Sequence, residues 1–202
     1  MTETRKAESC CASIKSRAAM PATFDDLTLE TPRLRLRPPR LDDLDAFAEM
    51  MIDEETARFI GGTMSRAMTW RGLMTMIGSW HAHGFAMFSV FEKSTGRWVG
   101  RLGPWMPEGW PGPEIGWSIV RDCWGRGYAV EGAIATTNWA FDTLGWTQVI
   151  HSIAPQNTAS QRVAQKLGSR LIGPGRLPAP YEHDMVDLWG QTREEWRKRH
   201  FD

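Results

Sequence analysis

The feature that most constrains the fold of this chain is a Gly-x-Gly turn between an apolar strand and an amphipathic helix: Trp124-Gly125-Arg126-Gly127-Tyr128-Ala129. Residues 114–120 read as the strand, and apolar positions after Tyr128 recur at the 3-4-7 spacing of one buried helix face until Gly145. The glycines remove the Cβ atoms that would keep a ligand from the backbone, while the first helical turn offers unpaired N–H groups and a partial positive charge. The pattern fits an ordinary tight turn or an anion site, whose natural ligand is a phosphate.

Length and charge limit what the chain can be. At 202 residues it suits one domain with a proper core, and 24 basic residues balance 24 acidic ones. Because there is no net positive field and no apolar run near about eighteen residues, we expect no nucleic-acid partner and no membrane segment. The N-terminus carries Glu3 and Glu8 where a targeting signal avoids acids, so a cytoplasmic location is expected. Cys10, Cys11 and Cys123 lack metal-ligand spacing, which favours free thiols and no metal site.

The chain divides into a tail and a domain. Residues 1–22 are polar, rich in Ala and Ser and without periodicity, so we expect a flexible tail. Met20 is a candidate second start, which leaves open whether residues 1–19 are made in the cell. Residues 23–202 are expected to form the single domain.

Strand-like and helix-like segments alternate along the domain without an internal repeat. The periodicities predict about six to seven strands and about four main helices, which together form an α+β or α/β sandwich with a mixed sheet between helices. Strands are expected near 33–37, 85–92, 98–102, 114–120, 149–153, from 171 and at 185–189, and helices at 42–51, 65–84, 128–144, 157–168 and briefly after 192. The Gly- and Pro-rich span 103–113 is expected to be a loop.

Four stretches in this order resemble the GNAT acyltransferase superfamily, and within it the branch of RimJ/RimL-type ribosomal-protein N-terminal acetyltransferases. The resemblance covers roughly residues 28–197. Each stretch is a weak signal alone, and the four together are strong: 30–38, 114–117 running into 124–129, Asn157 with Ser160 and 166–168, and 192–196. The resemblance implies one GNAT-like domain whose mostly antiparallel central sheet has splayed central strands.

The resemblance also implies acetyl-CoA as the cofactor. In the family the pyrophosphate of CoA lies on backbone N–H groups of the turn, which here is the segment from Cys123 to Ala129, and Arg126 can add a charge. The pantetheine arm enters between the splayed strands, here near Ile119 and Val120. Asp122 departs from the Gln or Arg that the family commonly has, and we expect its side chain to face solvent.

The implied reaction is direct attack of a neutral amine on the thioester, without a covalent enzyme intermediate. Glu114 is the first candidate for the general base, although an acid at a strand start also fits a solvent-facing or arginine-paired role. His151 and His183 are weaker candidates. Ser160 is the candidate acid, with Asn157 beside it at the thioester end, and both residues equally fit plain helix capping.

The acceptor and the oligomeric state stay open. The branch suggests a protein or peptide N-terminus, while Trp105, Trp110 and Trp117 could form an aromatic wall for a small amine, or simply fill the core. The leading hypothesis is an acetyl-CoA-dependent N-acetyltransferase, monomeric or homodimeric, and the alternative is a non-catalytic acyl-CoA-binding protein of the same fold. A generic nucleotide-binding domain fits less well, because the turn lacks the Lys-Ser/Thr of a P-loop and the third Gly of a dinucleotide fingerprint.

Overall fold

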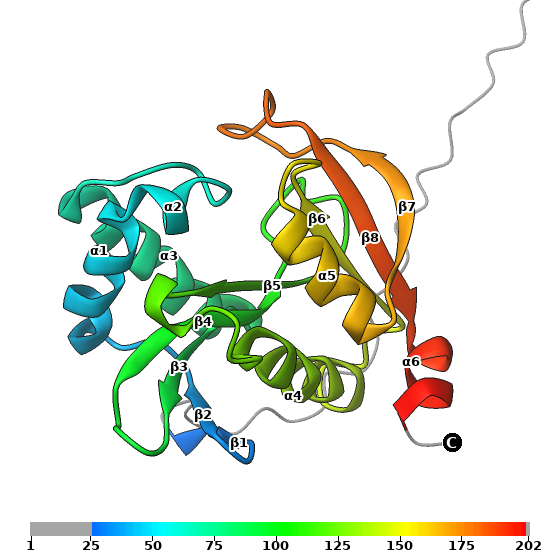
Figure 1. The fold of residues 1–202 in the computed structure, drawn as a ribbon, viewed down its shortest axis with the longest axis horizontal. Helices are drawn as coiled ribbons and strands as arrows, with labels where there is room; N and C mark the ends of the chain where they lie inside the picture. The colour runs from blue at the N-terminus through cyan, green and yellow to red at the C-terminus, as the bar shows by residue number, and fades with distance from the viewer. Residues whose placement is uncertain (1–25, 201–202) are drawn as a thin grey trace, which may run out of the picture.

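The computed structural model describes residues 26–200, and its centre is a single sheet of eight strands (Figure 1). The strands follow the spatial order β1-β2-β3-β4-β5-β6-β8-β7. Their bounds are β1 Leu29–Glu30, β2 Leu34–Arg37, β3 Phe88–Glu92, β4 Trp98–Trp105, β5 Glu114–Ile119, β6 Gln148–Ile153, β7 Arg170–Gly175 and β8 Val186–Thr192. The helices are α1 Leu44–Ile52, α2 Glu54–Ala57, α3 Arg66–His83, α4 Tyr128–Asp142, α5 Thr158–Leu167 and α6 Arg193–His200, with 3₁₀ turns at Leu41–Asp43 and Arg121–Cys123.

The sheet opens between its two central strands. Strands β1 to β5 pair antiparallel, as do β6, β8 and β7, whereas β5 and β6 run parallel and are in register only at Glu114 and Ile150. Beyond that pair the two strands separate, so the edge of β5 that faces β6 has no strand partner among residues 26–200. The splayed central strands expected from the family resemblance are therefore present.

Helices cover both faces of the sheet. Successive residues of a strand point to opposite faces, and on β4 the Leu102 side chain lies under α4, where a Cβ on Gly132 would come within 2.4 Å of it. The neighbouring Arg101 instead lies against Phe47 of α1 and Met76 of α3. Helices α1 and α3 thus cover one face, and α4 with α5 covers the other, as Figure 1 shows with α4 and α5 in front of the sheet.

The predicted caps of helices α3 and α6 are present in the structure. Ser65 caps α3 by accepting the Met68 N–H, and Gly84 ends that helix in the left-handed conformation with φ of 82°. Glu195 and Thr192 form the expected capping box at α6, where Glu195 Oε2 accepts the Thr192 N–H at 2.8 Å. These features depend on residues three or four apart, which the sequence places directly.

The α+β class is confirmed, while the predicted counts were low. The two-residue strand β1 and the one-turn helix α2 are too short to give a periodic signal. Strand β4 also continues to Trp105, three residues into the expected 103–113 loop, because its pairing with β5 reaches Trp105 opposite Glu114. The end of helix α4 was misplaced too, since it ends at Asp142, two residues before the last apolar position of the pattern.

The expected tail of residues 1–22 and the domain start at 23 lie outside the described residues, as do Cys10 and Cys11. Within residues 26–200, no helix has the length and apolar character needed to cross a bilayer.

Candidate active site

The glycine turn has the geometry of an anion site. Gly125 and Gly127 have φ of 75° and 82°, and Gly127 is the N-cap residue of α4. The first bond of the helix runs from the Glu131 N–H to the Gly127 carbonyl at 3.0 Å, so the amides between Gly125 and Val130 have no acceptor among the described residues. A Cβ built on Gly125 would meet no atom within 4 Å. The backbone is therefore open to a ligand at the positive end of the helix dipole.

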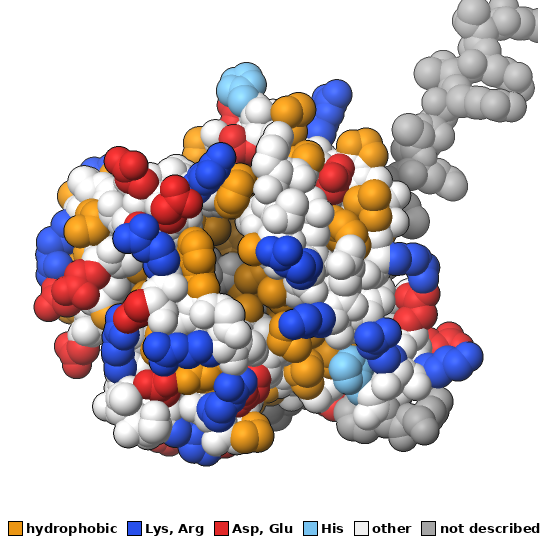
Figure 2. All heavy atoms as spheres, viewed as in Figure 1, with side chains coloured by type: hydrophobic (Ala, Val, Ile, Leu, Met, Phe, Trp, Pro, Cys, Tyr) orange, Lys and Arg blue, Asp and Glu red, His pale blue; other side chains and the backbone are white. Residues whose placement is uncertain are grey.

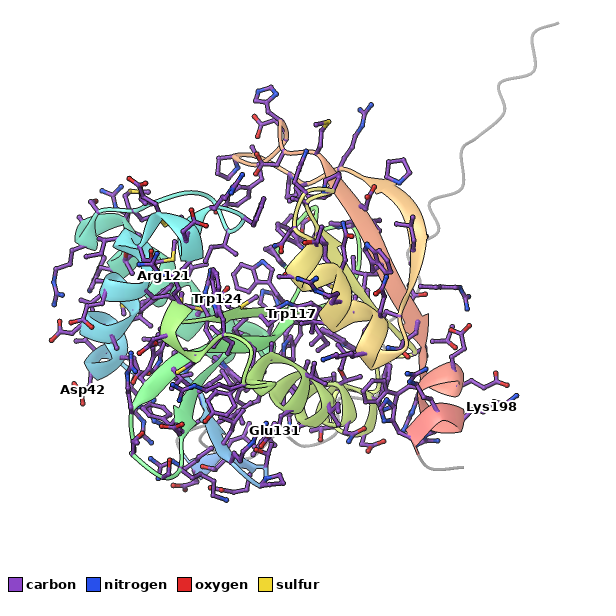
Figure 3. All side chains as sticks on the ribbon, in the orientation of Figure 1. Asp42, Trp117, Arg121, Trp124, Glu131 and Lys198 are labelled. Carbon is purple, nitrogen blue, oxygen red and sulfur yellow. The ribbon has the colours of Figure 1, made fainter. Side chains whose placement is uncertain are left out.

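Arg33, at the start of β2, holds this turn in place. Its Nη1 donates to the Arg126 carbonyl at 2.8 Å, its Nε donates to Glu131 Oε2 at 2.7 Å, and its guanidinium stacks over the Tyr128 ring at 4.9 Å. Glu131, on α4 (Figure 3), also accepts the Thr31 hydroxyl. Arg33 therefore fixes the turn through both its backbone and the first helical turn of α4.

The charged residues beside the turn are paired with one another. Asp122 is more than half exposed and forms an ion pair with Arg97 at 2.5 Å, which agrees with the expectation that it faces solvent. Arg126 lies 3.6 Å from Glu92, and Glu92 also accepts the hydroxyl of the buried Tyr128. The acidic departure from the family pattern is thus neutralised locally and leaves the turn free.

The open edge of β5 leads from this turn towards the middle of the sheet. Trp124 covers its end by donating its indole N–H to the Ile119 carbonyl at 2.6 Å, while the Val120 N–H and carbonyl are bonded to Val99 and Cys123. Since backbone groups alternate in direction along the strand, Trp117 and Ile119 present theirs to the gap. In Figure 3, Trp117 and Trp124 both lie beside β5 between the α1–α3 half and α5.

Glu114 is a buried carboxylate at the point where β5 and β6 separate. It is 7% exposed, and its Oε2 accepts hydrogen bonds from the Trp110 indole and the Ser152 hydroxyl, both at 2.7 Å. Burial raises the pKa of Glu114 to about 7, against the two hydrogen bonds, which lower it. A carboxyl with a pKa near 7 exchanges protons at neutral pH, as a general base must. Glu114 does not face solvent and forms no ion pair with an arginine of the described residues, which were the two alternative roles for an acid at the start of this strand.

Asn157 and Ser160 form a cap at the start of α5. Asn157 Oδ1 accepts the Ser160 N–H at 3.1 Å, so the capping role is present. The Ser160 hydroxyl in turn accepts the Trp117 indole N–H at 3.2 Å, which places it against the open edge of β5. A part for either residue in the chemistry stays a prediction.

The two histidines proposed as alternative bases have other surroundings. His151 is buried between the Ile115 carbonyl, 2.7 Å from Nδ1, and the Ser169 hydroxyl, 2.9 Å from Nε2. Burial lowers the pKa of His151 to about 4, so the ring is neutral and held on both nitrogens. His183 is exposed in the loop before β8 and lies on no strand of the described residues.

The three tryptophans named as a substrate wall divide between the two faces of the sheet. Trp105 pairs with Glu114 across β4 and β5, and Trp110 bonds to the same carboxylate. Trp117 projects to the other face, where its ring lies 4.9 Å from that of His151. Only Trp105 and Trp110 are therefore grouped with Glu114, and Figure 2 shows a hollow lined with hydrophobic side chains between the two halves of the molecule.

Three loops meet above the Glu114 face. A Cβ on Gly61 would lie 3.2 Å from the Tyr181 ring, and one on Gly109 would lie 3.3 Å from Pro178. The loops that contain Gly61, Gly109 and Tyr181 therefore lie against one another.

Ser152 and Tyr181 are two residues of the site that no motif in the sequence marks. The period-2 pattern of β6 was a usable signal for Ser152, because Ser152 shares a face with Ile150, the register partner of Glu114. Within residues 26–200 no group of His, Cys, Asp and Glu is arranged to hold a metal.

Comparisons with known proteins agree with this geometry. Residues 33–170 match the family model described as an acetyltransferase (GNAT) domain. The chain is 30% identical to an uncharacterized N-acetyltransferase p20 of Bacillus licheniformis over 152 residues. This aligned region covers 72% of this chain and 84% of that protein. An acetyltransferase structure from Agrobacterium tumefaciens is 28% identical, with a TM-score of 0.74 over 87% of this chain and all of that one. Mycobacterium smegmatis RimJ in complex with CoA-disulfide shares the fold at 20% identity, with a TM-score of 0.65 over 83% of this chain and 87% of that one.

Proposed function

The chain belongs to the GNAT acetyltransferase family, and on that premise we propose that it moves the acetyl group of acetyl-CoA to a primary amine by direct attack. The observation that carries the proposal is Glu114, a buried carboxyl with a pKa of about 7 where β5 and β6 separate. When bound, acetyl-CoA supplies the thioester that the amine attacks. The cofactor fits the residues present, since both an open anion turn and an unpaired strand edge are available to it.

The turn from Cys123 to Ala129 would hold the pyrophosphate through its free amides from Gly125 onward, since the N–H groups of Cys123 and Trp124 are already bonded. The edge of β5 would pair with the pantetheine amides through Trp117 and Ile119, whereas the backbone of Val120 is already bonded. The Trp124 indole, which donates to the Ile119 carbonyl, would then share that oxygen or turn away. Asn157 would stay the cap of α5 and keep Ser160 at the thioester end.

Glu114 would take the proton of the attacking amine as the N–C bond forms. A peptide α-amine has a pKa of about 8 and a lysine about 10.4, so a base with a pKa near 7 suits the former better. As the C–S bond breaks, the sulfur leaves as a thiolate with a thiol pKa of about 8.5, so it needs little help from an acid. Ser160 would supply that proton, and Trp110 and Ser152 would hold the Glu114 carboxylate in place.

A thiol-release assay tests the proposal. Purified protein with acetyl-CoA should release CoA when offered a panel of peptides with free N-termini and of small amines, and mass spectrometry should find the acetylated amine. Calorimetry with acetyl-CoA accompanies the assay. Binding without release on any acceptor would instead support a non-catalytic acyl-CoA-binding protein, and no binding would contradict the cofactor assignment.

A further inference from the structure

Arg101 of β4 stands out among the described arginines because it is largely buried and has no acidic partner among residues 26–200. Three described arginines are only partly exposed, and the other two each have a carboxylate: Arg37 lies 2.6 Å from Asp43, and Arg193 lies 3.0 Å from Asp142. No carboxylate among residues 26–200 forms an ion pair with Arg101. A partly buried charge without a partner is costly to a folded protein.

The contacts of the Arg101 side chain hold it without neutralising it. Its guanidinium carbon lies 4.9 Å from the centre of the Phe47 ring, and Nη1 lies 3.7 Å from the Met76 sulfur. The Nε atom is buried and has no hydrogen-bond partner. Burial lowers the pKa of Arg101 to about 10, while the Tyr181 phenol raises it, so the group remains a cation at neutral pH. The guanidinium therefore retains unused donors and a full positive charge.

Arg101 lies on the same face of the sheet as Glu114. It pairs with Ser118 in the β4–β5 register, and Trp105 pairs with Glu114 four residues further along. Residues of one parity share a face of a strand, so Arg101, Trp105 and Glu114 all point to the side covered by α1 and α3. The Tyr181 phenol, which acts on the Arg101 pKa, comes from the loop that closes over Gly61 on this side.

Arg101 and Glu114 do not converge on one point. Four strand residues separate them along the sheet, which is about 13 Å at a rise of roughly 3.3 Å per residue. The Glu114 carboxyl turns towards Trp110 and Ser152 of β6, while the Arg101 guanidinium turns towards α1 and α3. A molecule that reaches both groups must carry its charge several bonds away from its amine. A free α-amino acid, whose amine and carboxylate share one carbon, is too short.

We propose that Arg101 binds a carboxylate on the acceptor, so that the preferred acceptor is a peptide N-terminus with an acidic side chain within its first few residues. The placement of the amine at Glu114 rests on the proposed function. An extended peptide rises about 3.3 to 3.6 Å per residue, so the second to fourth residues cover the span once side-chain lengths are included. Arginine suits this task because its planar fork of donors matches a carboxylate.

The test compares two peptide amides that differ at one residue, with glutamate or glutamine at the second, third or fourth position. Calorimetry in the presence of CoA measures binding to the wild type, to Arg101→Met and to Arg101→Lys. For at least one position the wild type should bind the glutamate peptide about 10- to 100-fold more tightly, as a charge-assisted hydrogen bond in a largely buried site allows. Arg101→Met should bind both peptides equally and should not lower the melting temperature, because it removes an unpaired charge. Arg71→Met is the control, since Arg71 also lies against a methionine sulfur but is exposed on α3.

Equal wild-type affinity for the two peptides at every position would overturn the proposal, and so would an unchanged preference in Arg101→Met. If Arg101→Met does not fold, Arg101→Lys provides the test. Lysine keeps the positive charge but lacks the planar guanidinium donors, so this variant should lose most of the preference for the glutamate peptide. Glutamate preference in binding, without acetyl transfer to any peptide, would keep the anion site and contradict the proposed function. Acetyl transfer at equal rates to the glutamate and glutamine peptides would support the proposed function and contradict the anion site at Arg101.

Discussion

The indole Nε1 of Trp110 donates a hydrogen bond of 2.7 Å to Oε2 of Glu114, and this bond joins the loop between β4 and β5 to the buried carboxyl. Ser152 of β6 donates to the same oxygen, so the carboxyl bridges the two strands where they separate. Its raised pKa is the net result of burial, which favours the neutral acid, and of these donors, which favour the carboxylate.

Removing the indole donor should move the pH dependence of the reaction. Trp110→Phe keeps an aromatic ring but loses a bond that lowers the Glu114 pKa, so that pKa should rise further. Because the base must be deprotonated, the acid limb of kcat/KM against pH should move up by roughly half a unit to one unit. The ionisation of the acceptor is the same for both enzymes and cancels in the comparison. A limb that stays in place or moves down would contradict the role of this bond.

Glu114 should also make the fold less stable at high pH. Its folded pKa of about 7 exceeds the ordinary value of 4.5, so the folded state holds the proton more tightly, and the stability this gives is lost as the pH rises from 4.5 through 7. Glu114→Gln should therefore match the wild type near pH 4.5 and exceed it by roughly 2 to 3 kcal/mol near pH 8.5. Urea unfolding at the two pH values measures the difference, and equal stabilities at pH 8.5 would refute the raised pKa.

His151 should matter for stability and not for proton transfer. Both its ring nitrogens are bonded, and its pKa of about 4 leaves it neutral in the working range. His151→Leu removes the partner of the Ile115 carbonyl and one of the two partners of the Ser169 hydroxyl, which keeps its bond from Gln191, and this should cost about 1 to 3 kcal/mol. The acid limb of the pH profile should not move. Its disappearance in a folded variant would make His151 the base in place of Glu114.

The glycine turn should set the affinity for acetyl-CoA. A valine at position 127 must adopt a φ of 82° and also meets Arg33 at 3.4 Å from its Cβ, which disturbs the amides of the turn. We expect Gly127→Val to raise the KM for acetyl-CoA more than tenfold and to slow turnover more than Ser160→Ala does. Gly145→Val is the matched control, since Gly145 has φ of 71° but lies after α4 in open space. Equal activity of Gly127→Val and the wild type would remove the turn from the cofactor site.

Arg33 should act through the same turn from a distance. Arg33→Ala releases the Arg126 carbonyl and Glu131, so the KM for acetyl-CoA should rise a few-fold to about tenfold with kcat nearly unchanged. Arg33→Lys should rescue little, because an ammonium cannot bond Glu131 and the carbonyl in the same fork. Arg35→Ala is the control, since Arg35 is an exposed neighbour stacked on Phe91. If the two alanine variants behave alike, Arg33 is only a surface charge.

The parts of this account that the sequence predicted are those in which neighbours in the chain decide the outcome. The turn at Gly125 and Gly127 and the cap at Asn157 follow from residues within one helical turn of each other. The separation of β5 from β6 was expected only through the family resemblance, because it is a property of two strands that are far apart in the chain.

What the sequence did not predict depends on contacts between distant segments. Ser152 meets Glu114 across 38 residues, and Arg33 reaches Glu131 across 98, so no local pattern marks either pair. The partial burial of Arg101 arises only when α1 and α3 pack on β4, and its sequence neighbourhood resembles any alternating strand. Trp117 was grouped with Trp105 and Trp110 by composition, whereas strand parity sends it to the other face.

The most direct measurement compares the wild type with Glu114→Gln for acetyl transfer to a peptide N-terminus at pH 7.5, with calorimetry of acetyl-CoA binding on both. Glutamine keeps an oxygen for the Trp110 and Ser152 donors and cannot accept a proton from the amine. If Glu114 is the base, kcat should fall by about 10²- to 10⁴-fold while the Kd for acetyl-CoA stays within about twofold. A variant that binds acetyl-CoA normally and turns over at the wild-type rate would contradict the account.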